Sequence, residues 1–445
     1  MSNKCCHLAF GQPVKLHSLS PSFLLLFLLL SLTGCASQIV ASGLTPRQEK
    51  IEEIKEALTT VRGLKFTGEI PIVFGKKDVI KKQLEADLLQ NYGEEKLKDH
   101  SLAYAKLRLF PRGMDLKGSL LGFYGDRVAG FYDPRQRRVV LSGEPASRNH
   151  SDGIIYRETA LDEIVLLHEL THALQDQNFS LGPRLAPSDN NDKTLALRAI
   201  SEGDAILSEF VYRLGGVDQR PSAEIDQSLQ DSYEQLRSVL SHTPVAITDR
   251  VLFQYKVGAA FVYRVFKEKG WPGINRLYDS PPISTKQVLH PEKYLELPDL
   301  PTRVELTGLS GLFPSDWREI ESNTLGELMV QCLFKRFFSQ GEAETVASGW
   351  DGDRFIAFRR GDEVSFIWAT VWDSSNDADE FSRSYQQLLS RKHSGSQVAE
   401  SYVERRGQRV VVVEGLESAR VKDHIEKVWQ EMQLKEERSD LTSFE

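Results

Sequence analysis

The stretch from Thr159 to Gln177 constrains the fold most, because it predicts one long helix that carries two histidines on one side. It contains no glycine or proline, and Thr159 with Asp162 forms a start similar to a capping box. A helix of about five turns is therefore expected. Positions four residues apart on a helix lie about 40° apart around its axis. His168 and His172 thus project on the same side, where both can reach one ion.

The same spacing gives Glu169 a separate role. Two imidazoles four residues apart can both bind one zinc ion at about 2.0–2.1 Å. A glutamate next to the first histidine then lies beside the ion without binding it, where it can take a proton from a zinc-activated water. We expect His168 and His172 to bind Zn2+ and Glu169 to be the general base. The alternative is an amphipathic helix whose histidines bind no metal.

A catalytic zinc site needs a third protein ligand and an open position. A metzincin would have glycine at 175 and histidine at 178, but the chain has Gln175 and Asn178, which excludes that class. The next predicted helix offers Glu202 in "AISEGDA". Its neighbour Gly203 costs about 1 kcal/mol relative to alanine inside a helix, which close packing against the histidine helix would explain. Glu209, two turns on, is the second choice of ligand because it lacks small neighbours.

The segments "HELTHALQDQ" and "SEGDA" resemble the gluzincin zinc metallopeptidases. The second segment and the later "YKVGAAFVYRVF" are similar to the bacterial peptidase-MA-like families, and the resemblance covers roughly residues 120–294. It implies a zincin-type fold in which two helices carry the site. It also implies that His168, His172 and Glu202 bind the metal and that Glu169 is the catalytic base.

The chain departs from the thermolysin-like pattern at Ile206, where those enzymes have an aspartate that orients a histidine. Asp204 lies about 200° around the helix from Glu202 and cannot replace that aspartate from the same face. The residue that orients the zinc-binding histidines is therefore left open by the sequence.

A peptidase of this kind also needs a donor for the developing oxyanion and a place for the substrate backbone. His290, in the proline-bounded "LHPEKY", is the first choice of donor, with Tyr294 and Tyr255 as further candidates; a structural role for His290 is the alternative. Residues 128–141 predict a strand, a turn and a strand. This pair either binds an extended substrate at its edge or is a structural hairpin.

Residues 1–34 predict a bacterial lipoprotein signal peptide. The apolar run Phe23–Leu32 follows two lysines and is too short to span a bilayer. It ends in "LTGC", which resembles a lipobox, so we expect cleavage before Cys35 and lipid on that cysteine. Ala36, rather than aspartate, favours the outer membrane if the host is diderm. An ordinary secretory signal is the alternative.

The remaining chain predicts an α+β protein. Residues 35–64 form a lipid-anchored tether and an N-terminal helix. Residues 65–300 form a mainly helical zincin-like metallopeptidase domain with a small antiparallel edge sheet. Residues 301–445 form a C-terminal α+β domain, with a repeated hairpin and helix (ββαββα) from about residue 351. Prolines near residue 300 mark the domain boundary.

Together these features predict a lipid-anchored zinc metallopeptidase of the cell envelope, whose partners are a protein or peptide substrate and the membrane. The C-terminal domain would bind a further, unknown protein. The net charge of −8 and the lack of a basic block argue against nucleic acid. The alternative is a non-catalytic envelope binding or assembly lipoprotein with a structural zinc. Structural zinc sites usually have four protein ligands, so three ligands and a base favour the enzyme.

Overall fold

The computed structural model describes residues 46–127, 129–142, 158–214, 227, 230, 243–392, 401–416 and 418–436. The described residues from Glu49 onwards form one compact unit. The predicted signal peptide and Cys35 lie outside the described residues. Within the described part of the chain, every helix is either too short or too polar to cross a membrane.

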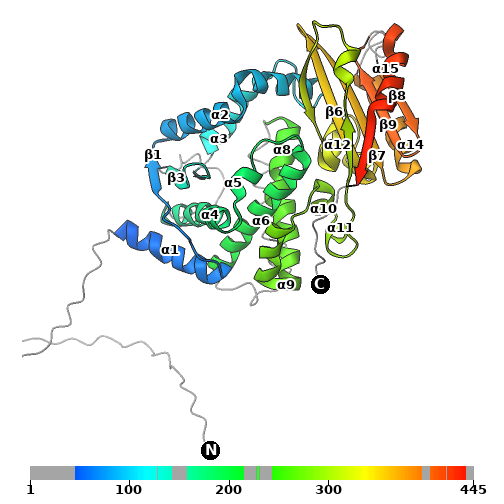
Figure 1. Cartoon of the computed structure of the whole chain (residues 1–445). Helices are drawn as coiled ribbons and strands as arrows, with labels where there is room; N and C mark the ends of the chain where they lie inside the picture. Colours follow the sequence, from blue (N-terminus) through cyan, green and yellow to red (C-terminus); the bar gives the residue numbers. More distant parts are fainter. Residues whose placement is uncertain are drawn as a thin grey trace, which may run out of the picture. The chain divides into compact units, whose positions relative to one another are not determined.

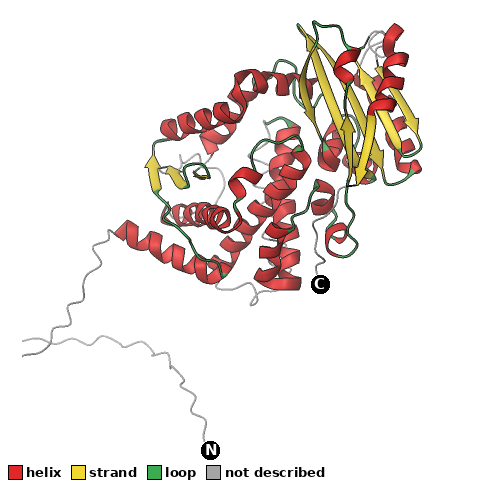
Figure 2. Cartoon of the chain, in the orientation of Figure 1, coloured by secondary structure: helices red, strands yellow, loops and turns green. Residues whose placement is uncertain are grey.

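The fold is α+β, as the sequence predicts (Figures 1 and 2). Helices predominate up to residue 300. They are α1 (Pro46–Arg62), α2 (Lys77–Lys106), α3 (Leu116–Arg127), α4 (Glu158–Phe179), α5 (Leu181–Arg184), α6 (Asn191–Leu214), α8 (Val245–Leu252), the π-helix η2 (Phe253–Val257), α9 (Gly258–Asp279), α10 (Thr285–Leu289) and α11 (Glu292–Leu295). The predicted histidine helix thus lies entirely within α4, although the side chains of its predicted cap lie outside the described residues.

A small sheet lies beside α4, in the strand order β1-β3-β2. Strands β2 (Gly130–Asp133) and β3 (Arg138–Ser142) pair in the antiparallel sense, as expected for the predicted hairpin. Strand β1 (Ile72–Gly75) pairs with β3 in the parallel sense, so the sheet is mixed. The sequence did not predict this pairing, because β1 and β3 are far apart in the chain. Strand β2 is an edge strand of this sheet.

The apolar spacing of α4 decides which way the histidines face. Leu166, Leu170 and Leu174 recur at intervals of one helical turn and belong to a buried cluster with Ile54 and Leu58 of α1. The histidines lie two residues on either side of Leu170, so they are on the opposite side of the helix. That side meets α6, and the site therefore forms between α4 and α6.

Helix α6 also packs closely against the start of α9. A Cβ atom on Gly203 would lie 2.4 Å from the carbonyl oxygen of Gly258, and one on Gly258 would lie 2.1 Å from that of Ala199. The sequence-based explanation of Gly203, packing against the histidine helix, is therefore wrong, because its close neighbour is α9. Gly258 thus lets α6 approach the start of α9 closely.

The C-terminal part contains a five-stranded antiparallel sheet in the order β5-β6-β7-β9-β8. Its predicted ββαββα pattern is confirmed, with Gly361 and Gly407 at positive φ in the two hairpin turns. The elements are β4 (Thr302–Leu306), the 3-10 helix η3 (Leu309–Leu312), β5 (Arg318–Asn323), α12 (Gly326–Lys335), α13 (Gln340–Ser348), β6 (Trp350–Arg360), β7 (Glu363–Trp372), α14 (Ser375–Lys392), β8 (Ser401–Arg406), β9 (Arg409–Glu414), α15 (Ser418–Glu431) and β10 (Met432–Glu436). Strand β10 pairs with β4.

The largest cluster of buried apolar side chains extends across residue 300. It contains Leu197 of α6 and Phe261 of α9 together with Phe334 of α12 and Trp368 of β7. The helical part and the C-terminal sheet thus share a core. The division into domains at residue 300 stays a prediction from the sequence.

Candidate metal centre

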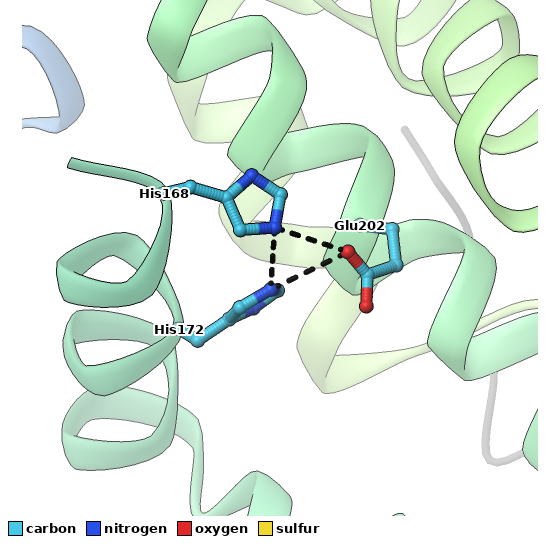
Figure 3. A group of neighbouring side chains, drawn as sticks. All are labelled: His168, His172 and Glu202. Carbon is cyan, nitrogen blue, oxygen red and sulfur yellow. Dashed lines mark hydrogen bonds and ion pairs between the residues drawn. The ribbon is translucent and has the colours of Figure 1, made fainter. Parts of the chain in front are cut away.

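Helices α4 and α6 bring His168, His172 and Glu202 together (Figure 3). The Nε2 atoms of the two histidines lie 3.1 Å apart. Glu202 Oε2 lies 3.2 Å from His168 Nε2 and 3.4 Å from His172 Nε2. Ligands at about 2.0–2.1 Å from a tetrahedral metal lie about 3.3–3.4 Å from one another. The three atoms are therefore spaced as ligands of one metal ion.

The second ring nitrogen of His168 is held by Glu209. His168 Nδ1 lies 2.6 Å from Glu209 Oε1, and an ionised carboxylate only accepts hydrogen bonds. The Nδ1 atom must therefore carry the proton, which leaves the Nε2 lone pair directed at Glu202. Glu209 was the second choice of ligand in the sequence; in the structure it orients a histidine. Its spacing of two turns from Glu202, on the same face of α6, was the available signal.

The second ring nitrogen of His172 is held by Gln175. The Gln175 amide nitrogen donates to the Ser201 carbonyl oxygen at 3.0 Å and to Asp204 Oδ2 at 2.9 Å, and both of these atoms can only accept. This fixes which way the amide points, so Gln175 Oε1 accepts from His172 Nδ1 at 3.0 Å. His172 thus has the same tautomer as His168, with its Nε2 lone pair free.

Three acceptor atoms therefore converge at this point, which is repulsive unless a positive charge lies among them. Burial favours neutral imidazoles, but the nearby carboxylates outweigh it and raise the pKa of His168 well above its ordinary value. The pKa of His172 is also raised, against the effect of burial, mainly by Glu202. The histidines in turn hold the pKa of Glu202 well below its usual range, although burial opposes this. The three ligand atoms could hold a metal ion, and their donor set would suit zinc.

A buried ion pair supports Gln175 from behind. Asp204 accepts from Tyr278 Oη at 2.7 Å and from Arg62 Nη2 at 3.2 Å, and Arg62 Nε lies 2.9 Å from Asp204 Oδ1. The side chains of Arg62 and Asp204 are both fully buried. Asp204 does point away from the face of Glu202, as expected, but it acts on His172 through Gln175. Helices α1, α4, α6 and α9 are thus tied together behind the centre.

Glu169 is a residue of α4, and its side chain contacts the edge strand β2. Its side chain is 8% exposed and accepts a hydrogen bond from the backbone N–H of Tyr132. Burial raises the pKa of Glu169, and the neighbouring His168 and His172 only partly offset this effect. Glu169 therefore faces the edge strand from the same helix that carries the two histidines.

The structure separates the three candidate oxyanion donors. In the described part of the chain, the polar partners of the His290 side chain are Glu327 at 2.8 Å and Glu292 at 3.9 Å, so His290 is not brought to the metal-binding triad. Tyr294 donates to the Ser280 carbonyl oxygen. The ring of Tyr255, in η2, is nearly parallel to that of His168, with a centroid distance of 6.4 Å and an interplanar angle of 13°. Of the three candidates, Tyr255 is therefore the one whose ring lies beside a residue of the triad.

Comparison with known proteins finds similarity in one segment and to one solved structure. A family model described as a domain of unknown function (DUF8575) matches residues 314–425, less than half of the chain. No curated protein matches. A crystal structure from Chloroflexus aurantiacus, described as a candidate hydrolase with a novel fold, is similar over 56% of this chain and 88% of that chain, with 21% identity and a TM-score of 0.33. Similarity this low assigns neither a fold nor an activity to the chain.

Proposed function

We propose that the protein is a zinc-dependent metallopeptidase, anchored to the bacterial cell envelope by lipid on Cys35. The observation that carries the proposal is the convergence of His168, His172 and Glu202 with both Nδ1 protons already held by acceptors. An incidental cluster of histidines would have no reason to direct two lone pairs and a carboxylate at one point. The signal sequence and Cys35 support the location, in the outer membrane if the host is diderm.

Zinc at these three ligands would polarise a peptide carbonyl and lower the pKa of a bound water towards about 7. Glu169 lies next to His168 and takes the proton of the attacking water. Glu169 then passes that proton to the leaving amine. Tyr255, whose ring lies beside that of His168, donates to the developing oxyanion.

The edge strand β2 gives the substrate a place to bind. Strand β2 is at the edge of its sheet, and the backbone N–H of Tyr132 in this strand donates to Glu169, so the edge lies beside the proposed base. An extended peptide can pair with such an edge through main-chain hydrogen bonds. This arrangement favours a protein or peptide substrate and brings its backbone next to Glu169.

The test measures zinc content and cleavage of an unfolded protein on the full chain, with and without chelator. Glu169→Gln should keep a full equivalent of zinc and lose about 10²–10⁴-fold in cleavage rate, because it removes the base and leaves the ligands. Glu202→Ala should lose both zinc and cleavage. Glu163→Gln is the matched control, since Glu163 is on the same helix and pairs with Lys50 at the surface.

The outcomes separate the possible functions. Full activity of the Glu169→Gln variant would disprove the mechanism. A wild-type protein that binds zinc but shows no chelator-sensitive cleavage would favour the non-catalytic binding lipoprotein. A wild-type protein without zinc would show that the histidines are not ligands.

A further inference from the structure

A cleft of about 600 Å³ lies outside the metal centre. Its walls come from the end of α2 and the residues after it, the segment before β5, and the turn between β6 and β7. Gly415, Leu416 and His424 complete the lining. None of the residues that line it belongs to α4 or α6. Its volume is in the range of pockets that bind small molecules.

One wall of the cleft is apolar and aromatic. Phe313 and Trp317 lie with their ring centroids 5.4 Å apart, and Phe313 stacks on Phe358 at 4.0 Å. Leu102 and Leu416 add aliphatic surface. This wall can cover an apolar or planar body, and the rigid aromatic pair requires little side-chain ordering when a ligand binds.

The rest of the lining carries more positive than negative charge. Arg360 pairs with Glu363, and Lys392 pairs with Glu414 at 2.7 Å beneath the cleft. Among the residues that the structure describes, the guanidinium groups of Arg108 and Arg112 have no hydrogen-bond or ion-pair partner. The charged lining residues are Lys106, Arg108, Arg112, Arg360, Asp362, Glu363 and Lys392.

The cations around Arg108 repel one another, and one acid, Glu414, opposes this effect. Burial lowers the pKa of Arg108, and Arg112 and Arg336 lower it further, with Glu414 opposing them. Burial likewise lowers the pKa of Lys392; its partner Glu414 opposes this, and Arg108 and Arg112 add to it. An anion that enters the cleft would meet the net positive charge of the lining residues.

The backbone at Arg108 gives an independent indication that its side chain is needed. Helix α2 ends with hydrogen bonds from Arg108 N to Ala105 O and from Leu109 N to Tyr104 O, both at 3.0 Å. These are the two bonds of a Schellman motif, and Arg108 occupies the left-handed position, with φ 65°, where glycine is the usual residue. A side chain there costs about 1–2 kcal/mol. The chain keeps an arginine at a position where glycine would be more stable.

We propose that this cleft binds a small ligand with a carboxylate or phosphate group on an apolar body. Arg108 and Arg112 bind the anionic group, because guanidinium groups match the geometry of both oxyanions. The wall formed by Phe313 and Trp317 covers the apolar body. This site is separate from the metal centre and does not depend on the proposed peptidase activity.

Calorimetric titration of the full chain tests this with four probes: hexanoate, hexyl phosphate, hexanol and inorganic phosphate. At least one of the two anionic amphiphiles should bind at least about tenfold more tightly than either hexanol or inorganic phosphate, because only they satisfy both walls. Whichever of hexanoate and hexyl phosphate binds more tightly identifies the anionic group. If neither binds below about 10 mM, the proposal is wrong.

Arg108→Gly is the decisive variant, because it removes the cation and relieves the backbone. It should raise the Kd of the tighter probe by about tenfold or more while the Tm stays equal or rises. Arg137→Gly is the matched control. Arg137 also has positive φ, 48°, but it lies in the turn between β2 and β3, so the Kd of the tighter probe for this variant should equal that for the wild type. Glu169→Gln should also leave the Kd unchanged, which keeps this result independent of the metal centre.

A wild-type Kd in a folded Arg108→Gly variant would overturn the proposal. Should that variant fail to fold, Arg112→Gln decides in its place, since Arg112 has no left-handed backbone to disturb. Loss of binding in Arg112→Gln supports the site, and unchanged binding contradicts it.

Discussion

Two buried carboxylate clusters of this protein use their hydrogen bonds in opposite ways. At the start of α12, Asp353 accepts from the backbone N–H groups of Leu325 and Gly326 and from the indole nitrogens of Trp350 and Trp368, at 2.9–3.0 Å. Each acceptor there meets a donor that the protein itself supplies. That cluster is complete, and it joins α12 to the large sheet.

The cluster between α4 and α6 is built differently. The donors of its two histidines are directed outwards, to Glu209 and Gln175, and the acceptors face one another. A buried polar cluster that satisfies itself stabilises the fold, whereas one whose acceptors converge needs something from outside the chain. The predictions below test this difference, from the largest expected effect to the smallest.

Asp353→Ala should have the largest effect on stability, because it leaves four buried donors without an acceptor. We expect the free energy of unfolding to fall by about 3–5 kcal/mol, measured by urea unfolding. The loss should be the same with and without chelator, since this cluster needs no metal. A loss below about 1 kcal/mol would contradict the view that the cluster is a structural one.

Removing the metal should destabilise the wild type but not a variant that lacks a ligand. With free zinc at about 1,000 times its Kd, binding contributes about 4 kcal/mol to stability, so chelator should lower the Tm of the wild type. The Tm of Glu202→Ala should not respond to zinc or chelator. A wild-type Tm that is insensitive to chelator would remove the contrast between the two clusters.

Glu209→Ala should weaken zinc binding by about 10–100-fold, because His168 loses the acceptor that fixes its tautomer. Competition with a chromophoric chelator measures the affinity. Glu209→Gln should weaken binding less, since its amide oxygen still accepts from Nδ1. Equal affinity in the wild type and the alanine variant would mean that Glu209 does not orient the ligand.

The free energy of unfolding should also depend on pH through Asp192, which lies at the start of α6 near Asp353. Burial raises the pKa of Asp192 to about 8, and the nearby carboxylate of Asp353 adds to this, against the hydrogen bonds from Thr285. The pKa of Asp192 is thus higher in the folded than in the unfolded chain, so the fold favours the protonated carboxyl group. The stabilising contribution of Asp192 is therefore fully present below about pH 4 and is lost as the pH rises towards 8.

Stability should therefore fall by up to about 1.4 kcal/mol per pH unit in this window. Asp192→Asn resembles the protonated carboxyl group and should flatten the dependence, which urea unfolding at several pH values would measure. A slope unchanged by the substitution would show that other groups titrate there.

Much of the site could be predicted from sequence because helical geometry is local. The spacing of His168 and His172 and the absence of helix breakers are sufficient to put both imidazoles on one side of α4. Glu202 was chosen by its small neighbours and by resemblance, and the structure does bring it to the histidines. The reason offered for Gly203 was nevertheless wrong, since that glycine packs against Gly258 of α9.

The sequence by itself determined the elements: the α4 helix with its histidine face, the helix that follows it, and the repeated hairpin and helix of the C-terminal part. Their periodicity and turn residues act over a few positions, so no distant contact is needed to recognise them. Only the tertiary structure decided that Glu209 and Gln175 orient the histidines and that Tyr255, rather than His290, lies beside them. Those roles depend on distances between elements far apart in the chain, which packing of the core sets and local pattern does not encode.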